Sequence, residues 1–299
     1  MNILIIGSKG FIGSHAVNYF KNKNNTVFEC DVVVDYNATN YFLINPSNAD
    51  FHDIFGNTTF DVCINCSGAA SVPDSVLNPH RDFELNVTNV FKILDAIRRY
   101  QPNCKFINLL SAAIYGNPSS LPIQESSLPN PVSPYGFHKL MAENILKEFN
   151  ILYSIPTLSL RLFSVYGPQL KKQLFWDIYK KIVEGNKNIE FSGTGFESRD
   201  FIYIDDVLQV FDLIISTCTF DGRAINIANG TETTINQAIE TFIDVYNWQG
   251  NVHYSGKNRL GDPTNWKADI SIIQSLGYTP SYTIKNGITQ YIKWLKEKI

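Results

Sequence analysis

The sequence predicts an α/β fold in which helices cover both faces of a parallel sheet. Short apolar runs alternate with helix-period patterns through the first half of the chain. In addition, the first apolar run breaks directly into a glycine-rich turn and then into a helix pattern. Both observations are typical of strand–helix–strand units, whose parallel strands are buried on two faces and are therefore largely apolar.

The elements of this fold follow in chain order. Apolar runs predict strands at residues 2–6, 26–30, 62–66, 105–110 and 157–162. Apolar residues at helical spacing predict helices at 12–21, 83–100 and 135–149. The stretch 117–134 is rich in Pro, Ser and Asn, which predicts a surface loop.

After residue 165 the alternation loosens, which predicts a change of organisation. The remaining patterns are helical at 174–183 and 205–215 and strand-like at 201–204 and 224–228. We therefore expect residues 1–165 to form the sheet domain. Residues 166–299 are expected to form a smaller α/β subdomain, some of whose elements return to the first sheet.

Composition limits the classes of function. The 299 residues are 44% hydrophobic and 18% charged, and a net charge of −3 argues against nucleic acid and anionic membranes as partners. No apolar run reaches the roughly 20 residues of a membrane span. The chain begins within a strand pattern, so we expect no signal peptide. Five scattered cysteines indicate reduced thiols and a cytoplasmic protein, and the five histidines lack metal-ligand spacing, so no metal site is expected.

The first glycine turn predicts a dinucleotide site. Gly7, Gly10 and Gly13 follow the strand at 2–6 with the spacing G-x-x-G-x-x-G. In a strand–turn–helix unit, such glycines permit a tight turn, a close approach of the backbone to a pyrophosphate, and close packing of helix on strand. The helix N-terminus then faces the phosphates.

The end of the second strand predicts the type of cofactor. Asp31 follows the apolar run at 26–30, and no Lys or Arg comes after it before Arg81. A carboxylate at this place accepts hydrogen bonds from the adenosine ribose and repels a 2′-phosphate, so NAD is favoured over NADP. Asp35 is the second candidate for this role. The structural alternative is that Asp31 is simply an acid in an exposed turn.

Three further residues indicate proton-transfer chemistry. The structural alternative is that Tyr135 and Lys139 only decorate a helix surface and that Ser111 is a helix or turn cap. Tyr135 and Lys139 are four residues apart and therefore share one helix face. An ammonium about 4 Å from a phenol, at an effective dielectric of about 20, favours the phenolate by roughly 4 kcal/mol, which would bring the tyrosine pKa from about 10 to near neutrality. Ser111 ends the apolar run at 105–110, and open parallel sheets bind ligands at that end of their strands. Its hydroxyl could share the reacting proton with Tyr135.

A series of motifs in a fixed order resembles the extended short-chain dehydrogenase/reductases, in particular the nucleotide-sugar epimerase/dehydratase family. The similarity covers nearly the whole chain. Its motifs are Gly7/Gly10/Gly13, 72–75, 85–87, Ser111 with 115–116, 133–139 with Glu143, 161–168, 193–195, 199–201 with 205–206, and 259–262. The resemblance implies a Rossmann-type doubly wound sheet with a smaller C-terminal substrate-binding subdomain. It also implies NAD as the cofactor and a nucleotide-diphosphate sugar as the substrate.

Roles for individual residues follow from the same resemblance. Tyr135 would be the base, Lys139 would hold the nicotinamide ribose, and Ser111 would bind the sugar oxygen. Arg199 and Arg259 would hold the diphosphate, which paired guanidinium groups suit, and Asp262 would contact the nucleoside ribose. The expected cofactor site comprises Gly7, Gly10, Phe11, Ile12, Gly13, Asp31, Tyr135 and Lys139. The expected substrate site comprises Ser71, Asn86, Ser111, Ser164, Arg199, Arg259 and Asp262.

Departures from the family pattern favour one type of reaction. Ser111-Ala112-Ala113 stands where the family's dehydratases carry Thr-Asp-Glu, and Ala113 also replaces the Glu of the decarboxylases. Gln169 replaces the His of the epimerase–reductases. The acid and base groups of those reactions are therefore missing, which leaves hydride chemistry at one sugar carbon. Two further departures do not favour any one reaction. Ser164 stands in place of the usual Asn, and His138 stands in place of the commoner Ser.

The leading hypothesis is an NAD-dependent nucleotide-sugar 4-epimerase, in which Tyr135 takes the proton of the C4 hydroxyl. The alternative is a 4-ketoreductase of a 4-keto-6-deoxy nucleotide sugar, for which NADPH is the usual donor. A remote alternative is a non-catalytic NAD-binding protein, which the retention of Ser111, Tyr135 and Lys139 disfavours.

Analogy with relatives also predicts a homodimer and a role in surface polysaccharide synthesis. The dimer contact would use the helices at 83–100 and 135–149. Apolar positions that permit it, but that packing within one chain would explain equally well, are Phe91, Leu94, Ile97, Ile145 and Phe149.

Overall fold

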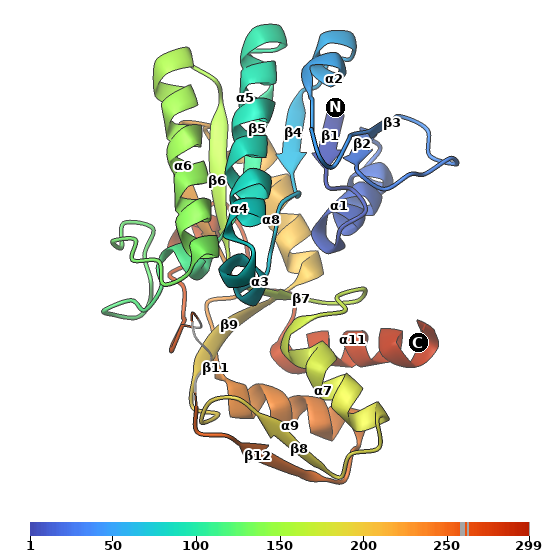
Figure 1. The fold of residues 1–299 in the computed structure, drawn as a ribbon, viewed down its shortest axis with the longest axis vertical. Helices are drawn as coiled ribbons and strands as arrows, with labels where there is room; N and C mark the ends of the chain where they lie inside the picture. Colours follow the sequence, from blue (N-terminus) through green and yellow to red (C-terminus); the bar gives the residue numbers. More distant parts are fainter. Residues whose placement is uncertain (258–260, 262, 299) are drawn as a thin grey trace.

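The largest unit of the protein is a seven-stranded parallel sheet, shown in the upper half of Figure 1. The structure is a computed structural model and describes residues 1–257, 261 and 263–298. The strand order is β10-β6-β5-β4-β1-β2-β3, so the winding direction reverses between β1 and β4. The strands are β1 (Asn2–Ile6), β2 (Thr26–Asp31), β3 (Tyr41–Leu43), β4 (Val62–Asn65), β5 (Lys105–Ser111), β6 (Thr157–Leu162) and β10 (Ala224–Ile227). The predicted doubly wound α/β fold is therefore confirmed.

Alternate residues of β1 face two hydrophobic cores, because successive side chains of a strand point to opposite faces. Ile3 and Ile5 belong to the core that includes residues of α1 (Phe11–Asn22) and α8 (Ile204–Thr217). Leu4 and Ile6 belong to the core that includes residues of α2 (His52–Asn57), α5 (Asn89–Tyr100) and α6 (Pro134–Tyr153). Figure 1 shows α5 and α6 on one side of the sheet and α8 behind it.

The helix expected at 83–100 differs from the observed structure in its first part. The chain forms α3 (Val72–Leu77) and α4 (Pro79–Phe83), then a π-helical turn over Glu84–Thr88, and only then α5. The backbone N–H of Asn89 donates to the carbonyl of Glu84, five residues earlier. A π turn accommodates one extra residue per turn, which apolar periodicity does not reveal, and such turns are frequent at functional sites.

The second half of the chain adds smaller layers below the sheet (Figure 1). Two small sheets are formed by β7 (Ser164–Tyr166), β9 (Ser198–Tyr203) and β11 (Glu232–Thr234), and by β8 (Asn188–Phe191) and β12 (Asn251–Tyr254). The helices here are α7 (Gln173–Val183), α9 (Ile235–Tyr246), α10 (Ser271–Ser275) and α11 (Ile284–Lys298). β10 returns to the large sheet and pairs in parallel with β6. In the described part of the chain, no helix has the length and apolar character needed to cross a membrane.

Candidate active site

The predicted site residues gather at the carboxyl ends of the parallel strands. Gly7 follows β1, Asp31 ends β2, Ser111 ends β5 and Ser164 follows β6. In a doubly wound sheet these ends share one edge, and ligands bind there beside the point where the winding reverses. The topology thus places the glycine turn and the candidate catalytic hydroxyl along the same edge.

Two glycines of the first turn allow helix α1 to pack closely against the turn after β1, where a side chain would clash. Gly7 has φ of +80°, and a Cβ on Gly13 would lie 2.0 Å from the carbonyl oxygen of Gly7. Helix α1 begins at Gly10 without a side-chain cap, so its first N–H groups are left to other partners. Phe11 and Ile12 are partly buried against the core and anchor this first turn.

Two buried polar side chains, one in this turn and one packed against Gly68 after β4, have no hydrogen-bond partner among the described residues. They are Ser8, through its Oγ, and Asn86, through both amide atoms. Each of these residues is 1% exposed. Asn86 lies in the π-helical turn, and a Cβ on Gly68 would come within 2.5 Å of its Oδ1. Unpaired buried polar groups are costly and call for an explanation. Together with the uncapped helix N-terminus, they fit a polar, phosphate-bearing ligand such as a dinucleotide.

Helix α6 presents Tyr135 to Ser111. The hydroxyl of Ser133 caps the helix by accepting from the N–H of Gly136, and Pro134 occupies the first turn. A Cβ on Gly136 would lie 2.6 Å from the carbonyl oxygen of Ala113, so glycine permits the helix to approach the turn after β5. The hydroxyl of Ser111 accepts from the N–H of Ala113 at 3.1 Å, and its proximity lowers the pKa of Tyr135.

Lys139 is 6% exposed and lies beneath Tyr135. Its Nζ donates to the carbonyl oxygen of Leu109 in β5 at 2.9 Å and lies 5.7 Å from the centroid of the Tyr135 ring. Burial lowers the pKa of Lys139 to about 8. The three residues Ser111, Tyr135 and Lys139, predicted from scattered parts of the sequence, therefore come together.

The pKa of Tyr135 differs from the expected near-neutral value. Burial raises it to about 12, although the nearby hydroxyl of Ser111 acts in the opposite direction. The ammonium of Lys139 lies over the ring and donates to a backbone carbonyl, so the simple estimate for a cation close to the phenol does not describe this geometry. A pKa this far above 7 favours the neutral phenol of Tyr135 at pH 7.

A buried acid next to these residues was missed by the sequence analysis. Asp82 of α4 is 3% exposed and lies against His138 of α6, with Asp82 Oδ2 2.6 Å from His138 Nδ1. The other oxygen of Asp82 has no hydrogen-bond partner in the described residues. Neither residue has a helical or strand spacing relative to the other, so only the position of His138 between Tyr135 and Lys139 could have drawn attention to the pair.

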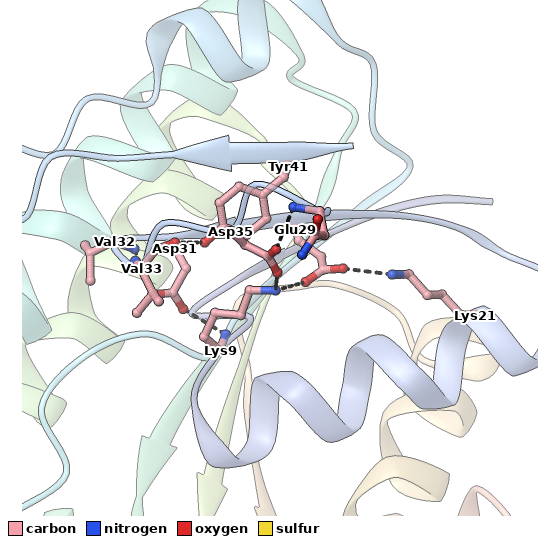
Figure 2. A network of polar contacts seen from close by, with 9 residues as sticks. Lys9, Lys21, Glu29, Asp31, Val32, Val33, Asp35 and Tyr41 are labelled. Atoms are coloured by element: carbon pink, nitrogen blue, oxygen red, sulfur yellow. Dashed lines mark hydrogen bonds and ion pairs between the residues drawn. The ribbon is translucent and has the colours of Figure 1, made fainter. Parts of the chain in front are cut away.

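Asp31 is tied to the glycine turn (Figure 2). Its Oδ2 accepts from the N–H of Lys9 at 2.8 Å, and its Oδ1 accepts from Val32 at 2.7 Å and Val33 at 3.2 Å. The side chain of Lys9 forms ion pairs with Glu29 and Asp35 close by. The residues that follow Asp31 in the sequence do not point to Lys9, because this lysine comes from the earlier glycine turn.

The predicted substrate residues lie in several elements, including α3 and the three-stranded sheet. Ser71 caps α3 by accepting from the N–H of Asp74 at 3.3 Å. Ser164 opens β7 and pairs in register with Phe201 of β9. The guanidinium of Arg199, also in β9, donates to the carbonyl oxygens of Ser198 and Thr264 and stacks on Trp266. Arg259 and Asp262 lie outside the described residues.

The described residues contain neither a metal-binding cluster nor, at Cys66, an activated thiol. No group of three or more His, Cys, Asp or Glu side chains is arranged there to hold a metal ion. All five cysteines are free, and burial raises the pKa of Cys66 to about 12, so this thiol is not activated.

Comparison with known proteins gives consistent matches along the chain. A family model described as the NAD dependent epimerase/dehydratase family matches residues 3–228. A curated protein from Methanocaldococcus jannaschii, provisionally named a UDP-glucose 4-epimerase, is 31% identical over 307 residues, and the alignment covers 98% of each chain.

Solved structures match over the whole fold. The UDP-N-acetylglucosamine 4-epimerase from Methanobrevibacter ruminantium M1, in complex with UDP-N-acetylmuramic acid, is 28% identical with a TM-score of 0.89, covering 100% of this chain and 99% of that one. The UDP-glucuronic acid 4-epimerase from Bacillus cereus, in complex with UDP-glucuronic acid and NAD, is 26% identical with a TM-score of 0.90, covering 100% of both chains.

Proposed function

Because the chain belongs to the NAD dependent epimerase/dehydratase family, we propose that it is an NAD-dependent 4-epimerase of a UDP-sugar. The observation that carries this proposal is the convergence of Ser111, Tyr135 and Lys139 at the sheet edge that also bears the glycine turn. The 4-epimerase names of the similar proteins described above support it.

The chain's own residues supply the proton chemistry of such a reaction. Tyr135 would exchange a proton with the C4 oxygen of the sugar, and Ser111, which lies close to Tyr135, would hold that oxygen. Lys139 adds a positive charge beneath the phenol ring, which favours the phenolate. A bound oxidised nicotinamide supplies the hydride acceptor and a further positive charge. Removal and return of hydride on opposite faces of C4 invert the configuration there.

The second half of the chain would provide most contacts to the nucleotide sugar. The side chain of Arg199 is held in place by its hydrogen bonds to Ser198 and Thr264 and by stacking on Trp266. A guanidinium group is suited to binding a diphosphate. Ser71, Asn86 and Ser164 would complete the substrate site. Arg259 and Asp262 keep their expected roles as part of this proposal.

The test is to incubate the purified protein with UDP-glucose, UDP-N-acetylglucosamine and UDP-glucuronate without added cofactor. Proton NMR would detect the C4 epimer, and denaturation would release any dinucleotide for identification. Interconversion of one sugar pair, with NAD released in about one-to-one ratio, is the expected result, since an epimerase regenerates its cofactor in every turnover. An empty protein that instead reduces a 4-keto-6-deoxy sugar with NADPH would identify the ketoreductase.

A homodimer is also proposed, built on the outer faces of α5 and α6. Leu94, Ile97 and Phe149 are buried in the core of one chain, so they are not available for this contact. Phe91, Phe137 and Met141 are more than two-fifths exposed and offer apolar surface instead. Sedimentation of the wild type and of Met141→Glu would test this, since a charge in an apolar contact favours the monomer.

A further inference from the structure

The adenosine end of the proposed dinucleotide site carries both an acid and a lysine, which favour different cofactors. An acid at the end of the second strand suits the ribose hydroxyls of NAD, whereas a cation beside it suits the 2′-phosphate of NADP. This chain has both: the backbone N–H of Lys9 donates to Asp31 at 2.8 Å, and the Lys9 ammonium pairs with Asp35, four residues after Asp31. The neighbouring Ser8 hydroxyl is buried and has no partner in the part of the chain described, which also marks this turn as a binding surface.

The ammonium of Lys9 is already engaged by two carboxylates (Figure 2). Its Nζ lies 3.1 Å from Glu29 Oε2 and 2.6 Å from Asp35 Oδ2, and 4.9 Å from the centroid of the Tyr41 ring. Burial opposes the charge of Lys9, but the bonds to Asp35 and Glu29 outweigh this effect and raise the pKa of Lys9. Lys9 is therefore a cation whose charge is neutralised within its own cluster.

The charge balance of this cluster is negative. Glu29, Asp31 and Asp35 bring three carboxylates, whereas Lys9 and Lys21 bring two ammonium groups, with Lys21 Nζ 2.8 Å from Glu29 Oε1. A phosphate ester adds a charge of about −1.5 to −2 at pH 7. Such a group beside Asp31 would be repelled by the carboxylates, and it could recruit Lys9 only by breaking two ion pairs.

We propose that Asp35 and Glu29 withhold Lys9 from the adenosine 2′-position and thereby make the site selective for NAD over NADP. The inference rests on the proposed binding of a dinucleotide, and it assigns a specificity role to three residues around Asp31. Asp35 is the residue to change, because its side chain is 31% exposed and that of Glu29 only 7%, so its replacement should leave folding intact.

The test measures binding rather than turnover. Calorimetric titration of the full chain, freed of copurifying dinucleotide, would give dissociation constants for NAD and NADP with the wild type, Asp35→Asn, Lys9→Gln and Asp35→Asn/Lys9→Gln. The wild type should bind NAD at least about tenfold more tightly than NADP. Asp35→Asn should narrow this ratio by about tenfold, mainly through tighter NADP binding, because Lys9 then keeps only its ion pair with Glu29. The double variant should restore the wide ratio.

Asp244→Asn is the matched control, because it removes one exposed carboxylate on α9, outside this cluster, and should leave the ratio unchanged. Equal affinity of the wild type for NAD and NADP would overturn the inference while leaving the epimerase proposal standing. A ratio narrowed equally with and without Lys9 would show that Lys9 has no part in selectivity and would also overturn it. If neither dinucleotide binds, both the inference and the proposed function fail.

Discussion

His138 Nδ1 lies 2.6 Å from Asp82 Oδ2, and this buried pair joins α6 to α4 just before the π-helical turn. The ring of Phe83 packs edge-on against the imidazole, with 5.4 Å between ring centroids. Burial dominates the pKa shifts of Tyr135 and Lys139, and the negative charge of Asp82 raises the pKa of both. The pair therefore fixes a charge that the candidate catalytic residues sense without contacting substrate.

Replacing Asp82 by Asn should move the pH profile of activity toward acid. Without the nearby negative charge the ammonium of Lys139 is less favoured, so its pKa falls below about 8 and the alkaline limb of kcat/KM moves to lower pH by roughly one pH unit. Glu84→Gln, an exposed acid in the adjacent π-helical turn, is the control and should leave the limb in place. An unchanged limb in Asp82→Asn would contradict the role of this charge.

Replacing Tyr135 by Phe should abolish most of the epimerase turnover and leave binding intact. The phenol is the proposed proton carrier, and loss of such a group lowers kcat by about 10²- to 10⁴-fold. Affinity for the UDP-sugar, measured by titration calorimetry, should change by less than about threefold, since one hydroxyl among many contacts is lost. Tyr100→Phe on α5, where the side chain is half exposed, is the matched control. Normal turnover by Tyr135→Phe would exclude the proposed base.

Removing one partner of the ion pair between Glu143 and Arg161 should strongly destabilise the folded protein. Glu143 is fully buried, accepts from Arg161 at 2.7 and 2.8 Å, and has a pKa below its usual value because the bonds to Arg161 outweigh burial. Glu143→Gln would leave the guanidinium without its counter-charge and should lower the free energy of unfolding by about 3 kcal/mol. Urea denaturation would measure this. Glu148→Gln, exposed on the same helix, should cost less than about 0.5 kcal/mol.

Asp200 should make the stability of the protein depend on pH between about 4 and 6. Burial raises its pKa to about 6, although the N–H groups of Ala268, Asn229 and Gly230 donate to it and act in the opposite direction. A raised pKa in the folded state means that folding favours the protonated acid. The associated stabilisation is complete below the unfolded pKa and is lost as pH rises through about 6, by at most about 3 kcal/mol.

The measurement is the difference in free energy of unfolding between the wild type and Asp200→Asn as a function of pH. Between pH 4 and pH 7 the wild type should lose free energy of unfolding relative to Asp200→Asn, because the amide does not titrate. A difference that stays constant over this range would show that the carboxyl of Asp200 ionises as easily in the folded as in the unfolded chain.

Elements with a local signal could be predicted from the sequence, and those that depend on distant partners could not. The strand 2–6 and its glycine turn were found because apolar run, turn and helix follow one another directly. Ser111 was placed correctly at the end of the fifth strand for the same reason. The π-helical turn over Glu84–Thr88 was missed because its apolar residues continue the helical pattern on either side.

The candidate site was predictable in its residue types but not in its electrostatics. Tyr135 and Lys139 share a helix face, as their spacing indicates, yet the pKa of Tyr135 depends on burial beneath other elements. The ion pairs of Lys9 and the pair of Asp82 with His138 join residues that are 20 or more positions apart in the sequence. No spacing rule connects such residues, so only the folded chain reveals them.

One of the two edge strands of the large sheet, β10, comes from residues 224–227, long after its neighbour β6 has been synthesised. Until those residues leave the ribosome, β6 is an open edge with unpaired backbone N–H and C=O groups. Such edges promote pairing between nascent chains. A gene fragment that ends near residue 165 should therefore aggregate more than one that extends through β10, in which the edge of β6 is paired.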